Sequence, residues 1–392
     1  MKNHFDHVVV GGGPMGASAA KYLALGGARV LLISAPEPAA DRAGLRSSHN
    51  DLSRLTRGLD GSPVWAKLAQ HSIARYKELE RSSGIPFFTE SGCLTLLESA
   101  APDAVDVAAN LMAVGAAAGV RCDPLDAAAL RTRFSALDVA TGARGFHERA
   151  DAGWVNPLDY VRAQIEVGRE SGLTVWPDIM ISAERGAQGV SVRTAGGLEC
   201  TADNALFAQG VYSLFAEPLF RQQELSVFAR TVVRVELDAA QVAALEGIPS
   251  MIVRGASDED NCYLVPPVRY PDGKHYIKIG GGRRAHMLES LSQLNEWYAG
   301  DGDPEIAARL LCRLEGLVPV TLPKGGISQA CSIAVAPSGL PIIEKIHNNV
   351  GVLTGGNGHA AKCGDEVGRL GSEMMLGNAR WSDGYPLNAF SG

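Results

Sequence analysis

Three β-branched residues near the start of the chain, Val8 to Val10, lead directly into the run Gly11-Gly12-Gly13-Pro14-Met15-Gly16. A short β-branched run that ends at glycine is typical of a buried strand. The alanine-rich stretch after the run favours a closely packed helix, and the apolar run from Val30 to Ile33 predicts a second strand. The chain therefore begins with a strand, a glycine turn, a helix and another strand.

The glycines of this turn have the spacing G-x-G-x-x-G, formed by Gly11, Gly13 and Gly16. In this setting the first glycine makes the tight turn, the second lets a pyrophosphate approach the backbone, and the third allows close helix–strand packing. A helix that starts at Pro14 and Met15 would direct its N–H groups and its positive dipole end at the phosphates. A glycine-rich turn without a ligand is the alternative, but both strands and the helix favour a dinucleotide site.

The carboxylate that usually binds the ribose of a dinucleotide is missing from its expected place, about 20 residues after the glycines. Ser34 ends the second strand, and the nearest carboxylate is that of Glu37. The motif therefore predicts a dinucleotide without indicating which one.

Composition limits the classes of protein that this chain can belong to. Its 392 residues exceed the roughly 250–300 that one core spans, so we expect two domains. A net charge of −7 argues against nucleic-acid and anionic-membrane partners. No stretch has the pattern of a signal peptide or a membrane span. The seven scattered cysteines favour free thiols in a reducing compartment, the cytoplasm, and the nine histidines show no metal-ligand spacing.

The hydrophobic pattern suggests how the two domains are arranged along the chain. Helical patterns cover residues 64–81 and 290–314, and residues 225–282 are rich in strand patterns. A second strand–glycine turn–helix pattern, "NNVGVLTGGNGHAAKCG", lies near the C-terminus. We therefore predict an α/β protein with one discontinuous, Rossmann-like nucleotide-binding domain and a second, strand-rich domain. The first would comprise residues 1–80, 145–222 and 325–392, and the second residues 81–144 and 223–324.

Four separated segments resemble one family of flavoenzymes. They are the Gly11–Gly16 unit, "SSHNDLSRLTR", "CYLVPP" followed by "YIKIGGG", and "ACSIAVAPSGLPII" followed by "GGNGHAAKCG". Together and in this order they resemble the flavin-dependent amine oxidases of the D-amino-acid oxidase superfamily, in the monomeric sarcosine oxidase and N-methyltryptophan oxidase branch. The resemblance implies FAD as cofactor. It also implies a Rossmann-like FAD-binding domain interleaved with a substrate domain on a mixed, largely antiparallel sheet.

The resemblance implies that Cys331 forms a thioether to the flavin, chemistry in which a thiolate is the nucleophile. The alternative is a buried cysteine that behaves as a small hydrophobic residue.

Cations for a substrate carboxylate are also implied by the resemblance. Arg57 and Lys362 match the two that hold it, because an amino acid must be oriented with its α-hydrogen towards the flavin. Arg54 matches an arginine near the flavin. The alternative for both arginines is a solvated helix face.

Lys278 lies in the apolar alternating pattern Tyr276-Ile277-Lys278-Ile279, where an unpaired buried lysine would be costly. The resemblance implies that it approaches the flavin and promotes reaction with oxygen by stabilising developing negative charge. The alternative is an outward-facing lysine of an alternating strand.

Further residues of the expected site follow from the same segments. Tyr263 matches an aromatic residue that lines the substrate cavity. The loop expected to contact the flavin contains Ser48 and His49, and the turn under the cofactor contains Gly356, Gly358 and His359.

The sequence departs from the branch at two places. Ser34 replaces the ribose-binding acid, so that Glu37 or water is left for that role. Gly282 stands where sarcosine oxidases have an active-site histidine, which predicts a larger or differently polar pocket and puts sarcosine itself in doubt. Arg283 or Arg284 could reach towards a bulkier or anionic substrate.

Taken together, these features predict an oxidase that converts the C–N bond of a small amino acid, most simply a secondary amine, to an imine. Dioxygen would be reduced to hydrogen peroxide, and the enzyme would be a monomer. Two alternatives remain open: a flavin dehydrogenase with another electron acceptor, and a non-catalytic dinucleotide-binding protein.

Overall fold

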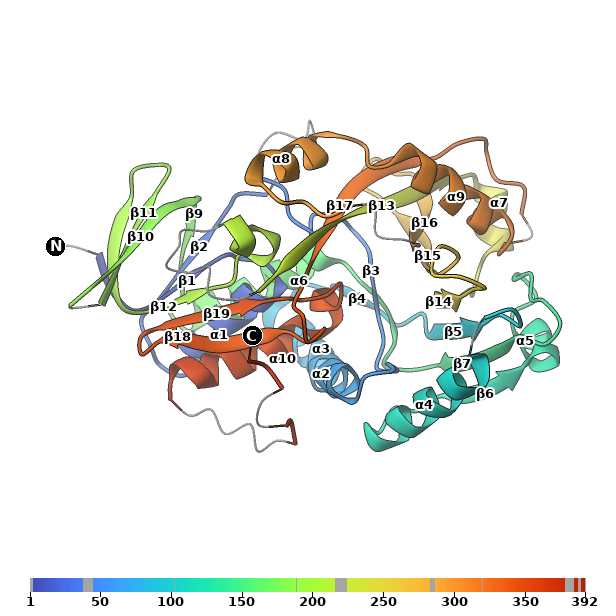
Figure 1. Ribbon diagram of the computed structural model, residues 1–392, viewed down its shortest axis with the longest axis horizontal. Helices are drawn as coiled ribbons and strands as arrows, with labels where there is room; N and C mark the ends of the chain where they lie inside the picture. Colours follow the sequence, from blue (N-terminus) through green and yellow to red (C-terminus); the bar gives the residue numbers. More distant parts are fainter. Residues whose placement is uncertain are drawn as a thin grey trace.

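The computed structural model of the protein describes residues 3–37, 45–101, 103–187, 189–215, 224–282, 286–318, 320–377, 384–386 and 389–391. Arg283 and Arg284 lie outside the described residues. Two large sheets dominate the described part, with the first at the left and the second at the right of Figure 1.

The first sheet has eight strands, and its centre is parallel. β1 pairs in parallel with β2 and with β12, β2 pairs in parallel with β9, and β12 with β19. Val8 to Val10 are buried on both faces of this sheet, as expected for a parallel strand covered by other elements. The strands are β10 (Met180–Gly186), β11 (Gly189–Thr194), β12 (Glu199–Phe207), β1 (Asn3–Val10), β2 (Val30–Ser34), β9 (Thr174–Pro177), β19 (Val350–Thr354) and β18 (Ile342–His347).

Helices from distant parts of the chain pack together beside this sheet (Figure 1). Small residues let α1 and α10 approach closely: a side chain on Gly364 would collide with Pro14, and one on Gly368 with Ser18. The helices are α1 (Pro14–Leu25), α2 (Pro63–Ile73), α3 (Tyr76–Ser83), α6 (Pro157–Glu170) and α10 (Ala360–Met375).

A buried charge cluster joins α1, α6 and α10 to the turn between α2 and α3. Asp365 on α10 accepts hydrogen bonds from Lys21 Nζ at 2.8 Å, Arg75 Nε at 2.5 Å and Gln164 Nε2 at 3.0 Å. Burial alone would raise the pKa of Asp365, but Lys21 and Arg75 lower it to about 2. The carboxylate therefore stays charged at neutral pH and is fully paired.

We expect Asp365→Ala to lower the free energy of unfolding by about 3–5 kcal/mol, because it leaves buried cations without their partner. Urea denaturation at pH 7 measures this effect. The matched control is Asp123→Ala, at an exposed ion pair, which should cost no more than about 1 kcal/mol. Since the folded-state pKa is depressed, the stabilisation is complete above about pH 4 and is lost as the pH falls towards 2. Equal losses for the two variants would contradict the role of the cluster.

The second sheet also has eight strands and is mostly antiparallel, with one parallel pair, β5 with β14. Its long strands β13 and β17 reach from this sheet towards the first (Figure 1). The strands are β17 (Ile327–Val335), β13 (Ser226–Leu237), β16 (His275–Gly281), β15 (Cys262–Arg269), β14 (Ser250–Arg254), β5 (Cys93–Leu97), β7 (Arg144–Glu148) and β6 (Asp123–Asp126). The two sheets confirm the predicted α/β class with a mixed, largely antiparallel second sheet.

The remaining elements surround the second sheet or link the two. A small third sheet contains β3 (Arg54–Thr56), β8 (Gly153–Val155) and β4 (Phe88–Thr89). The other helices are α4 (Ala104–Ala117), α5 (Ala127–Arg133), α7 (Ala239–Ala244), α8 (Leu291–Ala299), α9 (Pro304–Glu315) and the 3₁₀ helix η1 (Gly210–Phe215). Each of the two helical patterns predicted at 64–81 and 290–314 is interrupted, forming α2 with α3 and α8 with α9.

The predicted domain boundaries stay a prediction. Two strands, however, pair in a different sheet from the one that these boundaries imply. β17 and all of β7 except Arg144 lie in segments assigned to the nucleotide-binding domain, yet both strands pair within the second sheet. Hydrophobic alternation identifies a strand but not its partner, because pairing is set by the tertiary fold.

Candidate active site

A cavity of about 620 Å³, here called the main cavity, lies where the first sheet, the helices and strands β13, β15 and β17 meet. Most of the residues singled out in the sequence line it. They are Gly11, Gly13, Pro14, Met15, Ser34, Ser48, His49, Arg54, Arg57, Tyr263, Cys331, Gly356, Gly358, His359 and Lys362. Gly16 and Lys278 are not among the lining residues.

The glycine turn has the geometry that the motif predicts. Gly11 has φ +104°, and a side chain there would collide with the Ala208 carbonyl. A side chain on Gly16 would collide with the Gly11 carbonyl, so Gly16 serves helix–strand packing instead of lining the cavity. Gly13 caps α1, and Pro14 is the first residue of the helix. The N-terminal amides of α1 therefore lie at the main cavity.

The end of β2, where an acidic side chain usually binds the ribose of a dinucleotide, has a different arrangement of side chains here. Ser34 lines the main cavity and donates a hydrogen bond to the Ala35 carbonyl at 3.4 Å. Glu37 also lines it, and its carboxylate accepts bonds from Arg162 Nε at 2.9 Å and Nη2 at 2.6 Å. Sequence analysis missed Arg162, because its link to Glu37 spans 125 positions.

Cys331 lies on β17, half-buried at the main cavity. Arg54 Nη2 lies 3.8 Å from its sulfur, so a positive charge stands beside the thiol. The backbone on both sides is held by side chains: Trp297 Nε1 donates to the Cys331 carbonyl at 2.7 Å, and Ser48 Oγ to the Ser332 carbonyl at 2.7 Å. A positive charge next to a partly exposed thiol is typical of reactive cysteines.

Arg57, Lys362 and His359 converge on one carboxylate that sequence analysis did not single out, Asp60. Its Oδ2 lies 2.9 Å from Lys362 Nζ, 3.3 Å from His359 Nε2 and 3.6 Å from Arg57 Nη2. Burial alone would raise the pKa of Asp60, but Lys362, His359 and Arg57 hold it well below its usual value. Burial lowers the pKa of His359, whose ring stacks on Trp65 at 4.3 Å.

The loop between Arg57 and Asp60 is fixed from beneath. Glu148 Oε1 accepts hydrogen bonds from the amides of Gly58 at 2.8 Å and Leu59 at 3.1 Å.

Arg54 belongs to β3, so the solvated helix face considered for Arg54 and Arg57 is wrong. A strand of three residues is too short for its hydrophobic pattern to be distinguished from that of a helical turn.

A second buried carboxylate, Asp51, joins Lys278 to Arg54. Lys278 Nζ lies 2.9 Å from Asp51 Oδ2 and also donates to the Ser53 carbonyl, while Arg54 Nη1 donates to the same Asp51 oxygen. Tyr270 donates its hydroxyl hydrogen to Asp51 Oδ1 at 3.2 Å. Lys278 is therefore buried and paired, behind the wall of the main cavity, and is not the outward-facing lysine of the alternative.

Burial and neighbouring charges shift the pKa values of these groups. Burial lowers the pKa of Lys278 to about 8, although Asp51 opposes this. Burial, assisted by the charge of Arg54, lowers the pKa of His49 to about 4. Burial raises the pKa of Tyr263 to about 12. At neutral pH, His49 and Tyr263 are neutral and Lys278 is a cation.

The wall beside Tyr263 contains an arginine that sequence analysis also missed. Arg230 on β13 lines the main cavity, and its Nη1 donates to the Gly282 carbonyl at 3.0 Å. Gly282 has φ +66°, a conformation that favours glycine over the histidine of the resembled branch. The sequence feature that could have identified Arg230 is a charged residue within the apolar strand pattern "VFARTVV".

Comparison with known proteins decides the family of the chain. The model of the DAO family, described as FAD dependent oxidoreductase, matches residues 6–374. The chain belongs to the DAO family of FAD-dependent oxidoreductases. This confirms the resemblance inferred from the four segments.

The individual relatives of this FAD-dependent oxidoreductase share only a modest fraction of its sequence. A monomeric sarcosine oxidase from Streptomyces avermitilis is 32% identical over 197 residues, 50% of this chain and 49% of that protein. An N-methyl-L-tryptophan oxidase from Citrobacter koseri is 22% identical over 395 residues, 99% of each protein. The solved open form of NikD, an unusual amino acid oxidase essential for nikkomycin biosynthesis, has a TM-score of 0.78 at 19% identity and covers 99% of this chain and 97% of that one. This structural similarity shows a shared fold.

The main cavity of the FAD-dependent oxidoreductase fits a dinucleotide. Its volume is within the range of about 300–1,000 Å³ that is usual for ligand sites. Two buried atoms of lining residues, Arg57 Nε and Gln209 Oε1, have no hydrogen-bond partner among the described residues. Buried polar atoms normally have partners, so these two are suited to bind a polar ligand.

Two other structural findings concern the described residues alone. None of their helices is both long and apolar enough to cross a membrane. Within the same ranges, no three His, Cys, Asp or Glu side chains are grouped so that they could hold a metal ion.

Proposed function

We propose that this FAD-dependent oxidoreductase oxidises the C–N bond of a small amino acid, an N-methyl or cyclic secondary amine, to an imine. FAD, when bound, accepts a hydride equivalent from the carbon beside the nitrogen and passes the electrons to dioxygen, which yields hydrogen peroxide. The observation that carries the proposal is the convergence of Arg57 and Lys362 on the cavity that also contains Cys331 and the glycine turn. The printed names of the relatives, a sarcosine oxidase and an N-methyl-L-tryptophan oxidase, support this substrate class.

The charges of the Asp60 cluster suit one substrate carboxylate. Arg57 and Lys362 contribute two positive charges and Asp60 one negative charge, while burial keeps His359 neutral at neutral pH. These four groups together carry one net positive charge, and the next carboxylate, that of Glu148, binds the amides of Gly58 and Leu59 beneath them. Asp60 also spares the two cations the cost of being buried without a partner.

Tyr263, neutral and partly buried, and Arg230 would form the side of the pocket that surrounds the rest of the substrate. Glycine at position 282 leaves this side without the histidine of the resembled branch. We therefore expect a substrate bulkier than sarcosine.

A substrate screen tests the proposed function. N-methyl and cyclic amino acids should reduce the flavin without oxygen and release peroxide in air, whereas the corresponding amines without a carboxylate should react poorly. Flavin reduction by the amino acids without peroxide in air would favour a dehydrogenase instead. Failure of every amine to reduce the flavin would contradict the proposal.

Covalent attachment of FAD through Cys331 is a further part of the proposal. After acid precipitation the flavin should remain with the wild-type protein, and Cys331→Ala should release it into the supernatant. The matched control is Cys312→Ala, at an exposed cysteine, which should retain the flavin. Absorbance of the two fractions measures this. Release of all flavin from the wild type would show that no thioether exists.

We also propose that the enzyme is monomeric, like the sarcosine oxidase that it resembles, and cytoplasmic, as its free cysteines favour. Sedimentation at several concentrations would test the monomer.

A further inference from the structure

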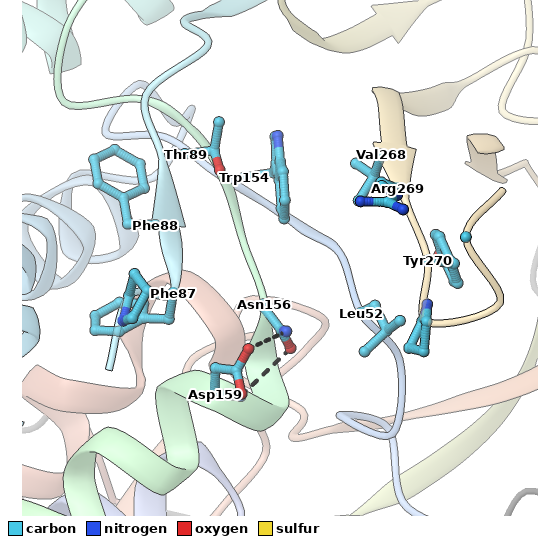
Figure 2. Close-up of a pocket in the computed structure, with 13 residues that line it drawn as sticks. Leu52, Phe87, Phe88, Thr89, Trp154, Asn156, Asp159, Val268, Arg269 and Tyr270 are labelled. Carbon is cyan, nitrogen blue, oxygen red and sulfur yellow. Dashed lines mark hydrogen bonds between the residues drawn. The ribbon is translucent and has the colours of Figure 1, made fainter. Parts of the chain in front are cut away.

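A second cavity, here called the side cavity, has a volume of about 550 Å³. Figure 2 shows Phe88 and Trp154 on one side of it and Val268, Tyr270 and Leu52 on the other. These walls come from the small third sheet, the end of β15 and the loop before β3. Large apolar side chains form most of the lining, and the polar side chains in it are those of Thr89, Asn156, Asp159 and Arg269.

The side cavity reaches the residues that surround the ammonium of Lys278. Leu52, which lines the cavity, stands between Asp51 and Ser53 in the chain, and Lys278 Nζ contacts both of these neighbours. Tyr270, another lining residue, donates its hydroxyl hydrogen to Asp51 at 3.2 Å. The residues that hold Lys278 are therefore joined directly, by chain or by hydrogen bond, to residues that line this cavity.

An apolar cluster continues from the side cavity to the main cavity. Val265, Val268, Tyr270 and Tyr276 form its buried centre, and Leu52, Trp154 and Tyr263 pack against it. Its members therefore include residues that line the side cavity and one, Tyr263, that lines the main cavity.

Strand register places Lys278 within this cluster. Lys278 pairs with Val265, and two residues away on each side Gly280 pairs with Tyr263 and Tyr276 with Val268. Residues two apart on a strand share a face, so Lys278 lies on the same face as Tyr276, a member of this cluster.

We propose that the side cavity is the entry route of dioxygen to Lys278. This inference rests on the proposed function, in which dioxygen is the electron acceptor. Dioxygen is small and apolar, so that an apolar passage favours it over water and charged solutes. The amino-acid substrate is charged, and the cations that suit its carboxylate, Arg57 and Lys362, line the main cavity. The two reactants thus reach the site from different sides.

Leu52→Trp in the holoenzyme tests the route, because it fills the inner end of the side cavity. In stopped-flow experiments the second-order rate constant for reoxidation of the reduced enzyme should fall about tenfold, equivalent to about 1.4 kcal/mol. The rate of anaerobic reduction by the amine should not change. The matched control is Leu25→Trp, at an exposed leucine of α1, which should alter neither rate.

Thr89→Trp, at an exposed position of the cavity mouth, is a second variant if Leu52→Trp does not fold. Xenon provides a readout that is independent of turnover, because it occupies apolar cavities. Crystals of the holoenzyme under xenon pressure should show the atom between Leu52 and Tyr270. Unchanged reoxidation in the folded variants, or xenon absent from the side cavity, would overturn the route. Failure of the wild type to be reduced anaerobically by any amine would instead contradict the proposed function.

Discussion

Replacing Arg57 or Lys362 by alanine should raise the apparent KM for an amino-acid substrate by the equivalent of about 2–5 kcal/mol, the range for a broken buried charge pair. Both cations lie at the main cavity, and Lys362 is buried. Attraction between opposite charges is stronger where little water is present. Removing one cation also cancels the net positive charge of the Asp60 cluster, so that a carboxylate would meet a neutral site.

The loss should be specific to the carboxylate. Flavin content should stay normal, and an amine without the carboxylate should be a poor substrate that loses little more in either variant. Arg193→Ala and Lys77→Ala, which remove exposed cations, serve as matched controls and should leave KM unchanged. If the amine reacts as well as its parent amino acid with the wild type, the proposed carboxylate site does not exist.

Lys278→Met should slow the reaction of the reduced enzyme with oxygen roughly 10²–10³-fold, as expected for loss of one preorganised charge. Reduction by substrate should change much less, because Lys278 lies behind the wall of the main cavity and does not line it. Stopped-flow measurement of the two half-reactions separates these effects. Methionine is chosen because it has a similar length and no charge.

The pH dependence provides an independent check. The pKa of Lys278 is lowered to about 8, so the ammonium is present below this pH and is lost above it. Reoxidation of the wild type should therefore slow as the pH rises through about 8, and the Lys278→Met enzyme should lack this step. Lys274→Met, which removes an exposed lysine after β15, should behave like the wild type. Equal slowing of both half-reactions by Lys278→Met would remove Lys278 from this role.

Local pattern was sufficient to predict the fold class and the nucleotide turn. The run from Val8 to Gly16 could be recognised from its own spacing. Gly16 packs against the nearby Gly11 carbonyl, whereas the carbonyl that excludes a side chain at Gly11 belongs to Ala208, far away in the sequence. The resemblance of four segments added the family, which the family match confirmed. The lining of the main cavity contains most of the predicted site residues, although their roles stay predictions.

What the sequence could not provide is the partner of each charged residue. Asp60 meets Lys362 across 302 positions, and Asp51 meets Lys278 across 227. These contacts depend on sheet register and on the path of the loop before β3, neither of which leaves a periodic signal in the chain.

The sequence by itself determined that a dinucleotide turn, a strand-rich second region and a set of cations are present. Only the tertiary structure decided that Lys278 is tied to Asp51 behind the cavity wall, that Asp60 balances Arg57 and Lys362, and that Arg230 lines the cavity. The physical reason is that residue type fixes which charges exist, whereas the energy of a buried charge depends on which opposite charge the fold brings within a few ångströms of it.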